Sequence, residues 1–82
     1  MKCDYQMIET KEQAALGHAY VGYGIEAWIG SGTERQRLHR VPDLFVSRER
    51  CERFVAMCNA EEVAPFHLLE IIDNLLAEEL QV

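Results

Sequence analysis

The chain has 82 residues, a hydrophobic fraction of 49% and a formal net charge of −6 at pH 7. The apolar content is ordinary for a folded protein, which excludes an extensively disordered chain, and the acidic balance disfavours a nucleic-acid-binding protein. A domain of this size gains only a small margin of stability from one core. We therefore expect residues 1–82 to form a single domain that is helped by a partner or by a second copy.

The cysteines and the hydropathy pattern bear on the cellular compartment. Three cysteines cannot all pair within one chain. The sequence shows no signal peptide, and no apolar run approaches the ~18 residues that a membrane span needs. We therefore expect a reduced, cytoplasmic protein that does not enter a membrane.

Alternating apolar and polar residues predict two strands in the N-terminal part. Residues 2–10 alternate imperfectly, and residues 11–17 are too few for a stable helix, so we expect a loop with at most one helical turn there. From residue 18 to residue 29 every odd position is apolar, which predicts the central strand. Its even positions place Tyr20 and Trp28 on either side of two glycines, a face that suits pairing with a second sheet.

A third strand is predicted over residues 33–41. It follows the turn signal Gly30-Ser31-Gly32. Its Arg-rich composition suits an exposed edge that must not pair with other chains. Pro42-Asp43 is expected to end it, because proline cannot donate a backbone hydrogen bond within a sheet.

Two amphipathic helices are predicted in the C-terminal part. Ser47 is a suitable N-cap for the first, and four apolar residues recur at helical spacing to form its buried face: Cys51, Phe54, Val55 and Cys58. Pro65 begins the second helix, which runs to about Leu80. Its apolar stripe is wider than one packing partner usually covers. We expect one group to pack on the sheet (Leu69, Ile72, Leu76 and Leu80) and another to point about 100° away (Leu68, Ile71 and Leu75).

The order of these elements predicts the fold class. Strands joined by short turns pair antiparallel, and a run of strands followed by a run of helices indicates an α+β domain. We therefore predict the order β-β-β-α-α, with a three-stranded antiparallel sheet packed on one face by a C-terminal two-helix hairpin. The helices should cover the face built from the odd positions of the central strand.

Several short motifs carry a resemblance to a known family. They are Tyr23-Gly24-Ile25, the Ser-capped helix that ends in Cys58-Asn59, and the later residues Val63-Ala64-Pro65, His67-Leu68, Ile71, Ile72, Asp73 and Leu76. In these motifs the chain resembles an uncharacterised family, a domain of unknown function, of small proteins from clostridia and related Gram-positive bacteria, over roughly residues 5–79. The resemblance implies no activity, cofactor or catalytic residue. The chain departs from the pattern at Asn74, where an acid often follows, and in its Arg-rich third strand.

Cys51, Cys58 and His67 form the one group of cysteine and histidine residues that is close in sequence. The two cysteines lie two helical turns apart, about 10 Å, which is too far for them to share a zinc ion. Both also lie on the apolar face, so we interpret them as core residues and expect no metal, no cofactor and no catalytic residue. The alternative is a small enzyme that uses Cys51 or Cys58 with His67.

Charges are unevenly distributed along the sequence. Six of the eight Lys and Arg residues lie between Arg35 and Arg53, whereas residues 59–82 contain six acids and no Lys or Arg. We interpret both blocks as solvated faces that oppose each other. The alternative is that the basic block binds nucleic acid, with Tyr20 and Trp28 stacking on bases, which the overall acidity disfavours.

The favoured hypothesis is a non-enzymatic protein that acts through protein–protein interaction or self-association. Its apolar side chains exceed what so small a domain buries, and no set of catalytic residues converges. The candidate interaction surface consists of Leu68, Ile71, Leu75, Tyr20, Trp28, Arg35 and Arg37. We expect a homodimer formed through the second helix, with the even face of the central strand as the alternative contact. The sequence leaves the biochemical activity and the identity of any unknown protein partner open.

Overall fold

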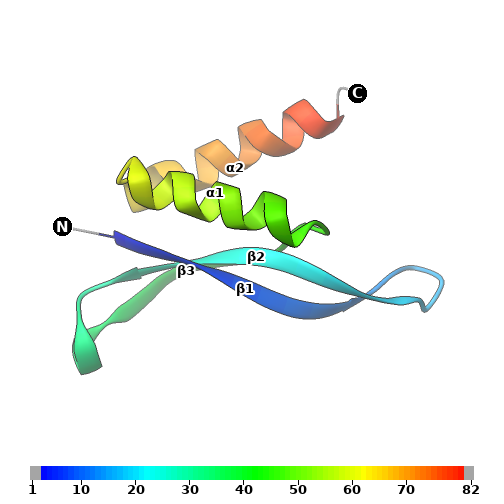
Figure 1. Ribbon diagram of the computed structural model, residues 1–82, viewed down its shortest axis with the longest axis horizontal. Helices are drawn as coiled ribbons and strands as arrows, with labels where there is room; N and C mark the ends of the chain where they lie inside the picture. The colour runs from blue at the N-terminus through cyan, green and yellow to red at the C-terminus, as the bar shows by residue number, and fades with distance from the viewer. Residues whose placement is uncertain (1–2, 81–82) are drawn as a thin grey trace.

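The protein consists of a three-stranded sheet covered on one face by two helices (Figure 1). The structure, a computed structural model, describes residues 3–80 and the side chains of residues 3–78. In chain order the elements are β1 (Cys3–Gln13), β2 (Ala19–Ile29), β3 (Gln36–Phe45), α1 (Arg48–Ala60) and α2 (Pro65–Leu80). The strands are antiparallel in the order β1-β2-β3, which confirms the predicted α+β fold.

The hairpin of β1 and β2 is longer than the sequence pattern indicated. Its register runs without interruption from the pair Cys3 and Ile29 to the pair Gln13 and Ala19. The loop expected at residues 11–17 is shorter than predicted, because residues 11–13 continue the strand and pair with β2. So short a run of helix formers cannot nucleate a helix against this pairing. A turn follows, in which Gly17 adopts a left-handed φ of 83° and donates its N–H to the Ala14 carbonyl.

The third strand differs from its predicted bounds at both ends. A short 3₁₀ turn, Gly32–Glu34, precedes it, and β3 continues past Pro42 to Phe45. The expected end at Pro42-Asp43 is wrong because these residues form a bulge inside the strand. The register with β2 shifts there, and Asp43 adopts a φ of 56°. A bulge is one of the few places in a sheet where proline is tolerated.

The bulge explains the two glycines of the central strand. A Cβ at Gly24 would overlap the carbonyl oxygen of Val41 and lie 2.8 Å from the Cα of Pro42. A Cβ at Gly22 would lie 2.5 Å from Oδ1 of Asp43. The space between Tyr20 and Trp28, considered as the alternative contact for a second sheet, is therefore occupied by the protein's own β3. The Tyr20 hydroxyl also donates a hydrogen bond of 2.6 Å to Asp43 Oδ2 and holds the bulge in place.

The core lies between the odd face of the sheet and the helices. Ile25 and Ala27 of β2 are fully buried, as predicted from the alternation of this strand. The four residues predicted for the buried face of α1 are all buried: Cys51, Phe54, Val55 and Cys58. The Ser47 side chain accepts a hydrogen bond from the Arg50 backbone N–H, which confirms the predicted N-cap. The first helix therefore forms where its sequence pattern placed it.

The predicted division of the α2 stripe is wrong. Leu68 is fully buried in the core together with Ile72, whereas Leu69 and Leu76 are 46% and 40% exposed. Leu68 is therefore not available as part of an interaction surface. The periodicity of a stripe this wide does not determine which side of the helix faces the core, and contacts with residues outside the helix leave no trace in it. The expected packing of Leu80 lies outside the described side chains.

Tyr5 is the residue that ties the segment before α2 to the sheet. The Asn59 side-chain amide, near the end of α1, accepts a 2.9 Å hydrogen bond from the Tyr5 backbone N–H and donates one of the same length to the Tyr5 carbonyl. The Tyr5 hydroxyl donates to the carbonyl of Val63 in the connector between the helices. Burial raises the pKa of this hydroxyl, so it stays protonated and keeps the connector attached to β1.

Candidate interaction surfaces

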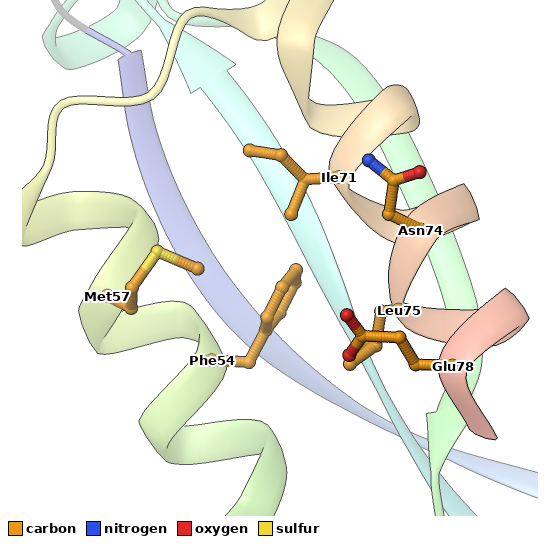
Figure 2. A pocket seen from close by; sticks show the side chains of 6 residues that line it. All are labelled: Phe54, Met57, Ile71, Asn74, Leu75 and Glu78. Atoms are coloured by element: carbon orange, nitrogen blue, oxygen red, sulfur yellow. The ribbon is translucent and has the colours of Figure 1, made fainter. Parts of the chain in front are cut away.

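A groove of about 250 Å³ lies between α1 and α2. Figure 2 shows Phe54 and Met57 projecting from α1 toward Ile71 and Leu75 of α2. The remaining lining comes from two polar residues of α2, Asn74 and Glu78. The Glu78 carboxylate lies beside Leu75 and points across the groove toward Phe54 (Figure 2). The groove therefore combines an apolar lining with a negative charge from one wall.

The lining residues differ in how much surface they offer. Phe54 is 8% exposed and belongs to the hydrophobic core as well as to the groove. Ile71 and Leu75 are partly buried against the core, and Met57 is 36% exposed. The lining is therefore anchored in the core, while part of the apolar surface of each wall still faces solvent.

The fold keeps the groove open by fixing the helices at one end. They meet at the connector, which Tyr5 attaches to β1 through Asn59 and Val63. In Figure 1, α2 rises away from the sheet toward its C-terminal end. Since α1 is pressed onto the sheet by its buried face, the two helices diverge away from the connector, and the groove lies between them.

A second apolar area lies on the flank of α2 that the core does not use. It consists of Phe66, Leu69 and Leu76, which are 74%, 46% and 40% exposed. The Phe66 ring contacts the ring of the exposed His67, with 4.3 Å between their centroids. The sequence analysis expected Leu69 and Leu76 to face the sheet, so this exposed flank was missed.

After Arg53 in the sequence, the helices and their connector carry acidic side chains but no Lys or Arg. Five acids of this region have described side chains, and all are exposed: Glu61, Glu62, Glu70, Asp73 and Glu78. The negative charge predicted for this part of the chain therefore lies on the surface of α2 and of the connector, and one of its carboxylates, that of Glu78, lines the groove.

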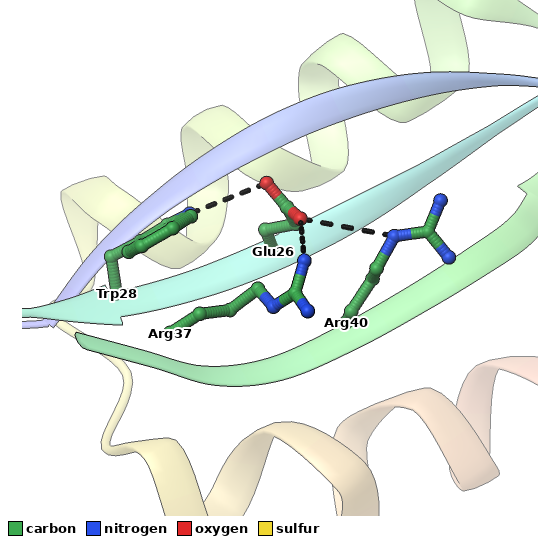
Figure 3. A network of polar contacts seen from close by, with 4 residues as sticks. All are labelled: Glu26, Trp28, Arg37 and Arg40. Carbon is green, nitrogen blue, oxygen red and sulfur yellow. Dashed lines mark hydrogen bonds and ion pairs between the residues drawn. The ribbon is translucent and has the colours of Figure 1, made fainter.

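The uncovered face of the sheet carries a charged cluster centred on Glu26 (Figure 3). Its carboxylate accepts a hydrogen bond of 3.0 Å from Arg37 Nη1 and one of 3.3 Å from the Trp28 indole N–H. Arg40 Nε lies 3.8 Å from the same carboxylate. The Arg35 guanidinium stacks over the Trp28 ring at 4.1 Å. The structure therefore brings together three residues of the predicted surface: Trp28, Arg35 and Arg37. Arg37 is paired with Glu26, and Arg35 stacks on Trp28, so both guanidinium groups already have a contact within the protein.

The basic block of the sequence does not form one surface. Arg37 and Arg40 lie with Glu26 on the uncovered face of the sheet, whereas Arg48 lies on α1, on the opposite side of the sheet. Arg48 pairs with Glu52 one helical turn along, at 2.9 Å. A nucleic-acid backbone would need these charges along one path, so the arrangement disfavours the nucleic-acid alternative.

The cysteines and histidine of the enzymatic alternative lie apart. Cys51 and Cys58 are fully buried, and Cys51 Sγ donates to the Gly24 carbonyl at 3.3 Å. Burial raises the pKa of Cys51 and raises that of Cys58 to about 11, so both remain neutral thiols at neutral pH. His67 lies on the exposed surface of α2. The fold therefore does not assemble a reactive thiolate with a base from these residues.

Tyr20, the remaining residue of the predicted surface, lies near the tip of the β1–β2 hairpin. With Lys11, Ala19 and Val21 it lines a shallow hollow of about 300 Å³. The hairpin tip extends beyond the helices (Figure 1), which leaves this part of the sheet uncovered. Tyr20 therefore lies apart from the groove between the helices.

Two further properties concern metals and membranes. Within residues 3–80, no three or more His, Cys, Asp or Glu residues are grouped so as to hold a metal ion. No helix in the described part of the chain has the length and apolar character needed to cross a membrane.

Comparison with known proteins places the chain in a family. Residues 1–78 match the family of unknown function DUF6514. The chain belongs to this family. The resemblance to a family of unknown function is thereby confirmed, and the match covers all six residues that line the groove. No curated protein and no solved structure matches the chain significantly.

Two residues of the groove were predicted as interaction residues, although no groove was predicted. Ile71 and Leu75 were predicted as interaction residues and do line it, whereas Phe54 was assigned to the core alone. Met57, Asn74 and Glu78 were missed. The available signal was the width of the apolar stripe on α2, which exceeds what α1 and the sheet can cover, but this signal does not say which side stays open.

Proposed function

We propose that this member of DUF6514 acts without catalysis, by binding another protein through the groove between α1 and α2. The observation that carries this proposal is the apolar lining of the groove, in which Met57, Ile71 and Leu75 keep surface exposed beside the buried Phe54. Covering a side chain such as Leu or Met completely stabilises an assembly by about 1.5–3 kcal/mol. Because Met57, Ile71 and Leu75 are already partly covered, each supplies only a fraction of this value, and the three together supply part of a binding energy.

The state of the thiols supports a role without catalysis. Both cysteines of α1 are buried and neutral, and the histidine considered as their base lies on the surface of a different helix. Three unpaired cysteines, Cys3, Cys51 and Cys58, also support our proposal of a reducing, cytoplasmic location.

Capture of partners by variants of the protein tests the proposed surface. Wild-type protein, Met57→Ser and Leu16→Ser would each be immobilised and exposed to a lysate of the native host. Leu16 is the matched control, because it is 87% exposed and lies in the β1–β2 turn, away from the groove. We expect the same partner to be retained by wild type and Leu16→Ser and lost from Met57→Ser. Equal retention by all three proteins, or retention by none, would refute binding through the groove.

A homodimer is the second candidate, and the exposed flank of α2 favours it. Phe66, Leu69 and Leu76 form an apolar area that a second copy can cover with the same residues. This contact replaces the one predicted from Leu68, which is buried within one protomer. Sedimentation equilibrium at micromolar concentration tests it. A dimer abolished by Leu69→Glu is expected, and a monomer at all concentrations would rule this candidate out.

A further inference from the structure

The size of the groove indicates what kind of group enters it. Sites that enclose small molecules usually have volumes of about 300–1,000 Å³, and this groove is smaller and open to solvent. It is therefore better suited to a few side chains of a larger partner than to an enclosed ligand. Its two walls are helices, with Phe54 and Met57 on one and Ile71 and Leu75 on the other.

A third helix is the element that best fits such a site. One row of its apolar side chains, spaced three and four residues apart, can enter the groove as a ridge. Amphipathic helices bind apolar grooves in this way in many protein complexes. A strand would leave its backbone groups unpaired here, because α1 and α2 satisfy their own backbone hydrogen bonds and offer no sheet edge.

The charge in the groove indicates which polar residues that helix should carry beside its apolar ridge. Glu78 lies in the lining itself, and Glu70 and Asp73 are exposed on the same helix. Glu78 is the one charged side chain among the six that line the groove. A cationic side chain beside the apolar ridge therefore approaches a carboxylate at Glu78, whereas an anionic one is repelled.

We propose that the partner segment is a basic amphipathic helix, whose apolar ridge packs on Met57, Ile71 and Leu75 and whose Lys or Arg residues pair with Glu78. The inference rests on the proposed function, and it adds the chemical class of the partner. A second copy of α2 fits this site poorly, because that helix is itself acidic and has no Lys or Arg. Anionic lipid and nucleic acid are disfavoured by the Glu78 carboxylate and by the net charge of −6.

Synthetic peptides test the class of partner directly. The probe is a labelled 18-residue helix with Leu at helical spacing and Lys elsewhere, compared with a Leu/Gln helix of the same pattern and with a scrambled Leu/Lys peptide. Fluorescence anisotropy measures binding to purified full-length protein. We expect the Leu/Lys helix to bind at least about tenfold more tightly than either comparison peptide, with an affinity that falls as salt is raised.

Two pairs of variants locate the binding. Met57→Ser is expected to weaken binding of the Leu/Lys helix about tenfold, whereas Leu16→Ser leaves it unchanged. Glu78→Gln is expected to weaken it several-fold at low salt, whereas Glu34→Gln removes the same charge from the turn before β3 and has no effect. Thermal melts confirm that each variant is folded before its affinity is interpreted.

Several outcomes overturn the inference, and they separate it from the proposed function. If the Leu/Gln helix binds as tightly and with the same dependence on Met57, the groove binds helices but the partner is not basic. If the scrambled peptide binds equally, the attraction is only electrostatic and the inference fails. Failure of every peptide to bind also refutes it, and partner capture then decides the proposed function separately. A wild-type dimer that Met57→Ser dissociates would make the occupant a second copy.

Discussion

Replacing Gly24 by Ala tests the packing of the β3 bulge on the central strand. A Cβ at this position would overlap the Val41 carbonyl oxygen and lie 2.8 Å from the Cα of Pro42. Carbon atoms at ideal separation lie about 3.5–4.0 Å apart, so the bulge must move by about 1 Å. Both opposing groups are backbone, and no side-chain rotation relieves the overlap.

The expected cost follows from these contacts. Overpacking of a well-packed site costs about 1–3 kcal/mol, and the rigid backbone at Gly24 places this change near the upper limit. Alanine is favoured over glycine within a strand by roughly 0.5–1 kcal/mol, which offsets part of that cost. The net loss of about 2 kcal/mol corresponds to a fall in Tm of roughly 8–16 °C for a domain of this size.

Gly22→Ala is the matched control, measured with Gly24→Ala by thermal denaturation followed by circular dichroism. Gly22 lies two residues away on the same face, but the nearest atom is the Asp43 carboxylate oxygen at 2.5 Å, which can rotate away. The change then sacrifices the exposed Tyr20–Asp43 hydrogen bond, so Gly22→Ala should stay within about 1 kcal/mol of wild type. A Gly24→Ala protein that melts at or above the wild-type temperature would show that the bulge does not pack on β2 as described.

Three further predictions concern stability. Asn59→Asp keeps an acceptor for the Tyr5 N–H but places a carboxylate oxygen against the Tyr5 carbonyl. Urea denaturation at pH 7 should therefore show that the free energy of unfolding falls by about 1–3 kcal/mol. An unchanged midpoint would contradict the role of Asn59. Burial raises the pKa of Cys58 from 9.0 to about 11, and the folded protein therefore holds this proton more tightly than the unfolded chain. The free energy of unfolding should accordingly fall as pH rises from about 9 to about 11, and less so in Cys58→Ala; equal slopes for the two proteins would disprove this assignment. Phe54→Ala, which truncates a residue of both the core and the groove, should lower the free energy of unfolding by about 3–5 kcal/mol. Leu16→Ala at the exposed turn should change it by less than about 0.5 kcal/mol. The reverse ranking would contradict the assignment of Phe54 to the core.

Local patterns in the sequence predicted the buried faces of β2 and α1, because each of these elements packs against the core through one face only. The alternation of β2 identified Ile25 and Ala27 as core residues, because a central strand has one covered face and period-two spacing assigns every side chain at once. The first helix has few apolar positions and a clear cap at Ser47, so its buried face could also be predicted.

The second helix could not be oriented in this way. Its apolar residues cover so wide an arc that either Leu68 or Leu69 can face the core, and the sequence pattern does not distinguish them. The position of the connector before α2 depends on Tyr5, which lies 54 residues before Asn59 in the sequence and hydrogen-bonds Asn59 and Val63. A contact between residues so far apart has no local signature.

The candidate groove was only partly predictable for the same reason. Ile71 and Leu75 could be named as interaction residues because α2 has more apolar residues than so small a domain can bury completely. Met57 and Glu78 became part of the site only through the angle between the helices. Likewise, Gly22 and Gly24 suggested a contact on the even face of β2, but that contact is the bulge at Pro42, which the sequence pattern presented as the end of a strand.

The most direct test of binding through the groove is a titration of isotope-labelled protein with the Leu/Lys helix, followed by NMR. We expect the shifted backbone and methyl signals to cluster on the residues that line the groove, which are Phe54 and Met57 of α1 and Ile71, Asn74, Leu75 and Glu78 of α2. Signals of Trp28 and Arg37, on the opposite face of the sheet, should stay unchanged. Shifts centred on Trp28 and Arg37 instead, with the groove signals unaffected, would contradict the account.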